Sequence, residues 1–224
     1  TKRTGLVINL PEMRMYNYPK PGNGEPPLVI THPVSVGRMD WETPLGKTRI
    51  VAKKKDPDWR PPQSLKDEAI AEGDEPLPDI VKAGPDNPRG RYAIRLGIPG
   101  YLIHSTNKPY GVGMRVTHGC LRMYPEDIEK LFDEVSVGTQ VQLINEPIKL
   151  GWLAGSLFLE LHPPMEEDSE KYQDYMQSVL DAIADFLADE NNADDIGAMD
   201  ISLSGGALRK AVEEQSGIPV LISR

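Results

Sequence analysis

Residues 101–105 read Tyr-Leu-Ile-His-Ser, and residues 117–122 read Thr-His-Gly-Cys-Leu-Arg. The first segment is a short apolar run typical of a β-strand, and the strand pattern ends at His104. The second segment carries Cys120, the single cysteine of the chain, directly after a glycine. A strand end can hold a base rigidly, and a glycine turn lets the backbone approach a substrate closely. The two segments therefore indicate a β domain that presents a histidine and a cysteine in one candidate site.

Short strand patterns fill the rest of the first 145 residues. Apolar or alternating runs recur there, and prolines and glycines separate them. A helix is expected from Pro125, because proline suits the first helical position and Glu126 and Asp127 favour the positive end of the helix dipole. Residues 1–145 are therefore predicted to form a mainly β domain. Its strands are expected at residues 5–10, 13–18, 28–31, 34–37, 48–52, 91–96, 101–104 and 140–144.

Residues 146–224 have a different character. The whole chain has 25 Lys and Arg against 34 Asp and Glu, a net charge of −9, and residues 146–224 alone carry −11. Residues 170–189 follow an amphipathic helical pattern, a second helix is expected at 207–215, and residues 157–162 resemble a strand. We therefore expect a smaller, acidic and mainly helical C-terminal subdomain. The acidic balance argues against nucleic acid as a partner, since phosphate binding needs clusters of Lys and Arg.

Residues 53–90 interrupt the strand patterns with a long, proline-rich segment that holds only a short helical pattern at 64–72. A segment this long and irregular inside a compact domain is usually functional or disordered. We interpret it as a loop that flanks the site, with a plain surface excursion as the alternative. Trp59 and the prolines beside it are candidates to cover the cleft, although a surface hydrophobic anchor fits Trp59 nearly as well.

Several classes of protein are disfavoured by what the sequence lacks. It has no run of 18 apolar residues, so we expect no membrane-spanning segment. Residues 1–5 contain no apolar signal segment, which fits either a cytosolic protein or a mature, trimmed chain. One cysteine cannot form an internal disulfide, and structural zinc sites normally need more than one thiolate, so neither a metal nor a cofactor is expected.

The residue types around Cys120 suit acyl transfer. A thiol reacts as its thiolate, and a nearby imidazole such as His104 can take the proton. Backbone N–H groups that converge at a turn can stabilise an oxyanion. Arg122 can bind a carboxylate through its planar fork, but a structural ion pair with Glu126 or Asp127 explains this arginine equally well.

The sequence resembles a known family. Residues 117–122, preceded by His-Ser at 104–105, look like the signature of the L,D-transpeptidase (YkuD-type) catalytic domain, in particular of its Gram-negative periplasmic members. The similarity covers most of residues 4–145. It includes residues 5–10, 34–37, 41–48, 125–132 and 137–141.

The resemblance implies a β-sandwich catalytic domain in the periplasm that acts on peptidoglycan stem peptides. Cys120 would attack the carbonyl of meso-diaminopimelate in a tetrapeptide stem, release D-alanine and form a thioester. His104 would be the general base and acid, oriented by the backbone carbonyl of Ser105, and the amides of Gly119 and Cys120 would form the oxyanion hole. The implied substrate-binding residues are Thr117, His118, Arg122 and Trp59, although His118 is equally well explained as structural.

The acceptor and three other functions stay open. The acceptor is either another stem peptide or the terminal lysine of an outer-membrane lipoprotein. Water in its place would make the protein a carboxypeptidase or a wall-cutting hydrolase. A sortase-like transpeptidase also uses His, Cys and Arg, but there we expect a later arginine and a wider His–Cys gap. A catalytically silent wall-binding module would lack a reactive thiol.

Overall fold

The computed structural model describes residues 3–38, 43–189 and 201–223, and the chain divides into two compact units. The first unit comprises Thr1–Asn9 and Met13–Ile144, and the second comprises Leu10–Glu12 and Asn145–Arg224. Part of the motif at residues 41–48 lies outside the described residues. The two units are described separately below.

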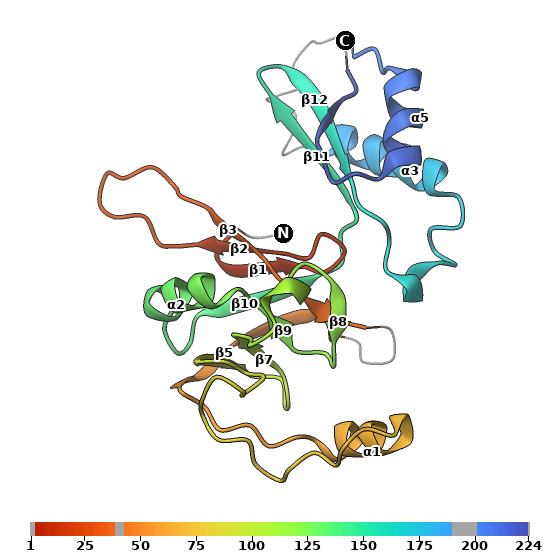
Figure 1. Cartoon of the computed structure of the whole chain (residues 1–224). Helices are drawn as coiled ribbons and strands as arrows, with labels where there is room; N and C mark the ends of the chain where they lie inside the picture. The colour runs from red at the N-terminus through yellow and green to blue at the C-terminus, as the bar shows by residue number, and fades with distance from the viewer. Residues whose placement is uncertain (1–2, 39–42, 190–200, 224) are drawn as a thin grey trace. The chain divides into compact units, whose positions relative to one another are not determined.

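The first unit is built on an eight-stranded sheet with the order β3-β2-β1-β10-β5-β6-β7-β9 (Figure 1). Neighbouring strands are antiparallel except for the parallel pairs β1–β10 and β7–β9. A separate parallel pair joins β4 and β8. The bounds are β1 Gly5–Asn9, β2 Arg14–Tyr18, β3 Ile30–Pro33, β4 Val36–Gly37, β5 Gly46–Lys55, β6 Tyr92–Leu96, β7 Leu102–His104, β8 Arg115–Thr117, β9 Leu121–Arg122 and β10 Gln140–Ile144.

Helix α2 (Pro125–Glu134) packs against this sheet. It begins at Pro125 as predicted, and its residues Ile128 and Leu131 are fully buried. The ring of Phe132 lies 5.1 Å from the ring of Tyr92 on β6. These contacts hold α2 against one face of the sheet, because burial of large apolar side chains is the main favourable term in packing.

Residues 53–90 are more ordered than the sequence indicated. Strand β5 continues to Lys55, and α1 spans Gln63–Glu72. Trp59 and Val81 form two backbone hydrogen bonds of 2.8 Å, which close the segment into a loop. The fully buried Asn87 ties the end of this loop to its beginning, because its Nδ2 donates to the carbonyl oxygen of Pro57 at 2.8 Å.

The second unit combines a three-stranded sheet, β11-β12-β13, with two helices. The strands are Ile148–Leu153, Ser156–Leu161 and Val220–Leu221, and the helices are α3 (Tyr175–Ala188) and α5 (Gly205–Glu214). Their apolar faces share one core, which includes Leu157, Leu159, Val179, Ile183 and Leu208. The sequence indicated only β12 of the three strands.

Caps explain where the two helices of this unit begin. Helix α3 starts five residues after the predicted boundary, because the side chain of Asp174 accepts a hydrogen bond from the backbone N–H of Gln177 at 2.9 Å. Ser204 caps α5 in the same way through the N–H of Ala207. A single-turn 3-10 helix at Glu166–Asp168 precedes α3, and another occupies Pro109–Gly111 in the first unit.

The fold class predicted from the sequence is confirmed: a mainly β protein with a smaller helical part. Within the described ranges, no helix has the length and apolar character needed to cross a membrane.

Candidate active site

The backbone holds His104 firmly at the end of β7. Its side chain is buried, with 7% of the residue exposed. The N–H of Met123 donates to the carbonyl oxygen of His104 at 3.0 Å, and the N–H of Ser105 donates to Tyr92 at 2.9 Å. Because β7 lies between β6 and β9, the strand ladder fixes the histidine from both sides.

The neighbouring carbonyl sets the tautomer of His104. Nδ1 of the imidazole lies 2.5 Å from the carbonyl oxygen of Ser105. A carbonyl oxygen only accepts hydrogen bonds, so Nδ1 carries the proton and Nε2 keeps its lone pair. His104 is therefore arranged to accept a proton at Nε2.

Burial and charge both keep His104 neutral. The pKa of His104 is lowered to about 3, mainly by burial; the positive charges of Arg122 and Arg89 also lower it, and the hydrogen bond to Ser105 opposes them. At neutral pH the imidazole is therefore unprotonated and available as a base.

Cys120 lies between a glycine turn and β9. Gly119 has φ +88°, a conformation that favours glycine, and its carbonyl oxygen accepts a hydrogen bond from Thr43 Oγ1 at 2.9 Å. Among the described residues, none accepts a hydrogen bond from the backbone N–H of Gly119 or Cys120. The turn therefore leaves two adjacent donors beside the thiol.

The thiol of Cys120 is protonated in its resting environment. It is half-buried and lies 3.6 Å from the carbonyl oxygen of Gly100, to which it donates a weak hydrogen bond. Burial raises the pKa of Cys120, while a backbone hydrogen bond from Leu102 and the charges of Arg89 and Arg122 lower it. Both Cys120 and His104 are described, and no hydrogen bond joins them.

Arg122 extends from β9 beside Cys120. Its backbone exchanges two hydrogen bonds with Ser35, at 2.8 and 3.1 Å. Burial lowers the pKa of Arg122, while Cys120 and Tyr110 raise it. Its Nε atom is buried without a hydrogen-bond partner in the described part of the chain.

The structural ion pair suggested for Arg122 is not formed. Within the described residues Arg122 has no carboxylate within 4 Å, and Asp127 lies 3.4 Å from Nδ1 of His32 instead. The alternative with Glu126 or Asp127 as its partner is therefore wrong.

Thr117 and His118 have different surroundings. The hydroxyl of the buried Thr117 donates to the carbonyl oxygen of Cys120 at 2.6 Å, which closes the turn. Nε2 of His118 lies 2.8 Å from Glu68 on α1 and 3.1 Å from Arg38. Arg38 and Glu68 also form an ion pair, and hydrogen bonds from Arg38 and His118 lower the pKa of Glu68. The excursion at residues 53–90 therefore contacts the cysteine motif through α1.

Trp59 is not joined to the cysteine motif by any polar or ring contact of the described residues. It is half-buried, and its backbone pairs with Val81 inside the excursion. The residue that the sequence did not single out is Arg89, whose charge interacts with both Cys120 and His104. A lone arginine in an irregular segment gives no signal in the sequence, since only the fold brings it to the site.

One group of potential metal ligands occurs among the described residues, and it lies in the second unit. Ligand atoms of Glu12, Glu160 and His162 are within 4.8 Å of one another. Nζ of Lys149 lies 2.7 Å from Glu160 and 3.2 Å from Glu12, so an ammonium group already compensates these carboxylates. We assign no metal to this cluster.

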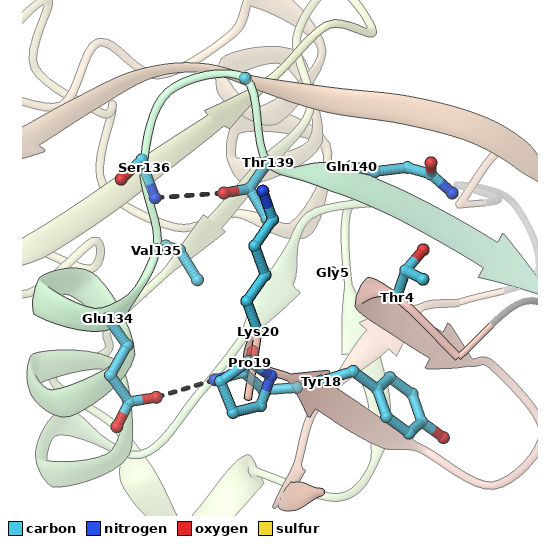
Figure 2. Close-up of a pocket in the computed structure, with 12 residues that line it drawn as sticks. Thr4, Gly5, Tyr18, Pro19, Lys20, Glu134, Val135, Ser136, Thr139 and Gln140 are labelled. Carbon is cyan, nitrogen blue, oxygen red and sulfur yellow. Dashed lines mark hydrogen bonds between the residues drawn. The ribbon is translucent and has the colours of Figure 1, made fainter. Parts of the chain in front are cut away.

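The first unit also contains a cavity of about 680 Å³ between β1, β2 and the segment after α2 (Figure 2). Glu134 accepts a hydrogen bond from Asn17 at 2.7 Å on one wall, and Lys20 extends between the walls. None of the predicted site residues lines this cavity. It is therefore separate from the candidate active site.

Comparison with known proteins agrees with the motif. The sequence model of YkuD, the L,D-transpeptidase catalytic domain, matches residues 3–143. Probable L,D-transpeptidase YbiS of Escherichia coli K12 is 37% identical over 227 residues, which cover 100% of this chain and 69% of YbiS. Probable L,D-transpeptidase ErfK/SrfK of the same strain is 38% identical over 225 residues, which cover 100% of this chain and 68% of that protein. A solved L,D-transpeptidase from Mycobacterium smegmatis aligns with a TM-score of 0.47 and 22% identity over 63% of this chain and 58% of that one.

The family model and the two full-length relatives identify the chain as one of the transpeptidase enzymes. The chain belongs to the L,D-transpeptidase (YkuD) family. The resemblance found in the motif residues is thus confirmed, and the second unit is shared with the relatives, because both align with the whole chain.

Proposed function

We propose that the chain is a periplasmic peptidoglycan L,D-transpeptidase that works through a thioester on Cys120. The observation that carries the proposal is the arrangement of His104: a neutral imidazole whose Nδ1 is held by Ser105 and whose Nε2 is free to accept a proton. The family assignment supports the reaction class, and the single cysteine is the proposed nucleophile.

The first step is acylation. Nε2 of His104 takes the thiol proton, and the sulfur attacks the carbonyl carbon of the diamino acid in a tetrapeptide stem. The carbonyl oxygen gains negative charge, which the N–H groups of Gly119 and Cys120 stabilise. The C–N bond then breaks, His104 gives its proton to the leaving amine, and D-alanine departs from the thioester.

The second step is transfer. His104 removes a proton from the acceptor amine, the nitrogen attacks the thioester, and the C–S bond breaks to return the proton to sulfur. The acceptor is an amine of another stem peptide, which gives a 3-3 cross-link, or a lysine of an outer-membrane lipoprotein. Among the proposed binding residues, Arg122 holds a substrate carboxylate and His118 lines the site. Thr117 positions the turn through its bond to Cys120.

Product analysis tests this function. Disaccharide tetrapeptide is incubated with the protein, with and without an amine acceptor, and the products are identified by mass spectrometry. We expect loss of D-alanine and an amide product that appears only with the acceptor. Release of D-alanine with water as the only acceptor would identify a hydrolase, and no reaction of any donor would support a silent wall-binding module.

A further inference from the structure

Arg89 is held in place by a buried turn. Oδ1 of the fully buried Asn87 accepts a hydrogen bond from the backbone N–H of Arg89 at 2.9 Å. Through its Nδ2, the same asparagine is anchored to the carbonyl oxygens of Pro57 at 2.8 Å and Lys82 at 3.2 Å. The backbone at residue 89 is therefore tied through Asn87 to two other parts of the excursion.

The next residue lies directly against the residue that orients the base. Gly90 has φ +61°, and a Cβ atom built on it lies 2.6 Å from Oγ of Ser105 and 2.9 Å from the backbone nitrogen of Thr106. Only a glycine allows this approach without displacement. The side chain of Arg89 therefore branches from the backbone one residue before the contact with Ser105, whose carbonyl oxygen orients His104.

The guanidinium of Arg89 has no carboxylate partner in the described part of the chain. Arg91, two residues further on, is paired with Asp56 at 3.5 Å and is mostly exposed. Arg89 is partly buried, and burial lowers its pKa while the charge of Cys120 raises it. The charge of Arg89 thus interacts with Cys120, and among the described residues no acidic side chain pairs with it.

Two guanidiniums without a carboxylate partner among the described residues consequently interact with one thiol. Arg122 has no carboxylate within 4 Å among the described residues, and its Nε is buried without a partner. Burial of a charge without a partner costs free energy, and Arg122 pays this cost at its Nε while Arg89 is only partly buried. Anions that arrive with the substrate would compensate both charges. Guanidinium groups bind carboxylates in bidentate pairs, which suits them to this role.

We propose that Arg89 is a second carboxylate-binding residue, so that Arg89 and Arg122 together select an acyl donor with two free carboxylates near the scissile bond. The inference rests on the proposed function. The tetrapeptide donor offers two such groups, the terminal carboxylate of the leaving D-amino acid and the free carboxylate of the diamino acid. Arg89 binds one of them and Arg122 binds the other.

Donor amidation combined with substitution of Arg89 tests the proposal. The kcat/KM for transfer is measured with three donors: the free tetrapeptide, the peptide amidated at the diamino acid, and the peptide amidated at the terminal residue. In the wild type we expect each amidation to lower kcat/KM by about tenfold to a hundredfold, the scale of a charge-assisted hydrogen bond. In Arg89→Gln, one amidation should have no further effect and the other should keep its full effect.

The matched control is Arg91→Gln, which removes the same charge two residues away and should keep the wild-type response to both amidations. Arg89→Lys should recover part of the lost kcat/KM, since it keeps the charge but not the fork. Thermal unfolding of each variant separates a folding defect from a binding defect.

Three results would overturn the inference. Arg89→Gln could match the wild type on every donor, or lose the same factor on all three. Alternatively, alkylation of Cys120 by iodoacetamide could slow in Arg89→Gln in parallel with transfer, which would mean that Arg89 acts only on the thiolate. If instead the wild type releases no D-alanine from the free tetrapeptide, the proposed function itself fails.

Discussion

Nδ1 of His104 and the backbone carbonyl oxygen of Ser105 are 2.5 Å apart, and both residues are buried. This contact joins the base to a main-chain group rather than to an acidic side chain. The orientation of the imidazole therefore depends on the backbone path from β7 through Ser105, which other parts of the first unit hold in place.

The buried His104 makes stability depend on pH. Burial lowers its pKa to about 3 in the folded protein, from 6.5 for an unperturbed histidine. Between these values the unfolded chain binds the proton and the folded protein does not, so the free energy of unfolding falls as pH drops below about 6.5 and levels off near pH 3. From pH 6.5 to 4.5 the contribution is about 2–3 kcal/mol.

Urea unfolding at pH 7 and pH 4.5 measures this contribution. His104→Gln lacks the titrating group and should lose about 2–3 kcal/mol less than the wild type over this interval. An equal loss in both proteins would mean that the folded protein binds the His104 proton as readily as the unfolded chain.

Gly90→Ala should damage catalysis as well as stability. The new Cβ meets Ser105 Oγ at 2.6 Å, so Ser105 must shift and the carbonyl that orients His104 moves with it. We expect kcat to fall at least tenfold, with a misplaced base as the cause, and the pH profile of Cys120 alkylation to change.

The control for this substitution is Gly73→Ala. Gly73 also has a positive φ, +78°, but an added Cβ there meets nothing within 4 Å. Both variants should lose about 1–3 kcal/mol of stability from backbone strain. If the two variants keep the same kcat, the contact between Gly90 and Ser105 has no part in positioning the base.

Arg122→Lys should weaken use of the peptide donor without much effect on the thiol. Lysine keeps the charge but loses the planar fork that binds a carboxylate in a bidentate pair. We expect kcat/KM for tetrapeptide to fall about tenfold, with little change in alkylation of Cys120 by a neutral reagent. Wild-type transfer by Arg122→Lys, or a parallel loss of stability and activity, would argue against substrate binding.

Carbapenems should form a covalent adduct with Cys120. Their strained carbonyl is an acyl donor, and attack by the sulfur opens the ring to leave a slowly hydrolysed thioester. Intact-protein mass spectrometry should show the added mass of one intact drug molecule, which Cys120→Ala should lack. Absence of any adduct at millimolar drug would contradict an acylating Cys120.

The regular strands were predictable because local pattern decides them. Strand β10 (Gln140–Ile144) has the predicted bounds, since its residues alternate between apolar and polar and its neighbours are turn residues. Strand β9 (Leu121–Arg122) was missed, because two residues carry no periodicity and their pairing with β7 is a tertiary contact. The same reason applies to β13.

The chemistry near Cys120 was only partly visible in the sequence. The cysteine and the histidine stand in one recognisable motif, whereas Arg89 lies 31 positions before the cysteine in a segment without a regular pattern. The contact between Glu68 and His118 is similar, because it depends on how α1 folds back. The resting state also differs from a simple thiolate–imidazolium pair, since burial favours the neutral forms of both groups.

The central claim is that Cys120 carries the acyl group, and trapping of the intermediate tests it most directly. The wild type and Cys120→Ala are mixed with disaccharide tetrapeptide without an amine acceptor, quenched in acid and measured as intact proteins. The wild type should gain the mass of the donor minus D-alanine, and Cys120→Ala should gain nothing while unfolding at a similar temperature. Transfer activity in a well-folded Cys120→Ala protein would contradict the account.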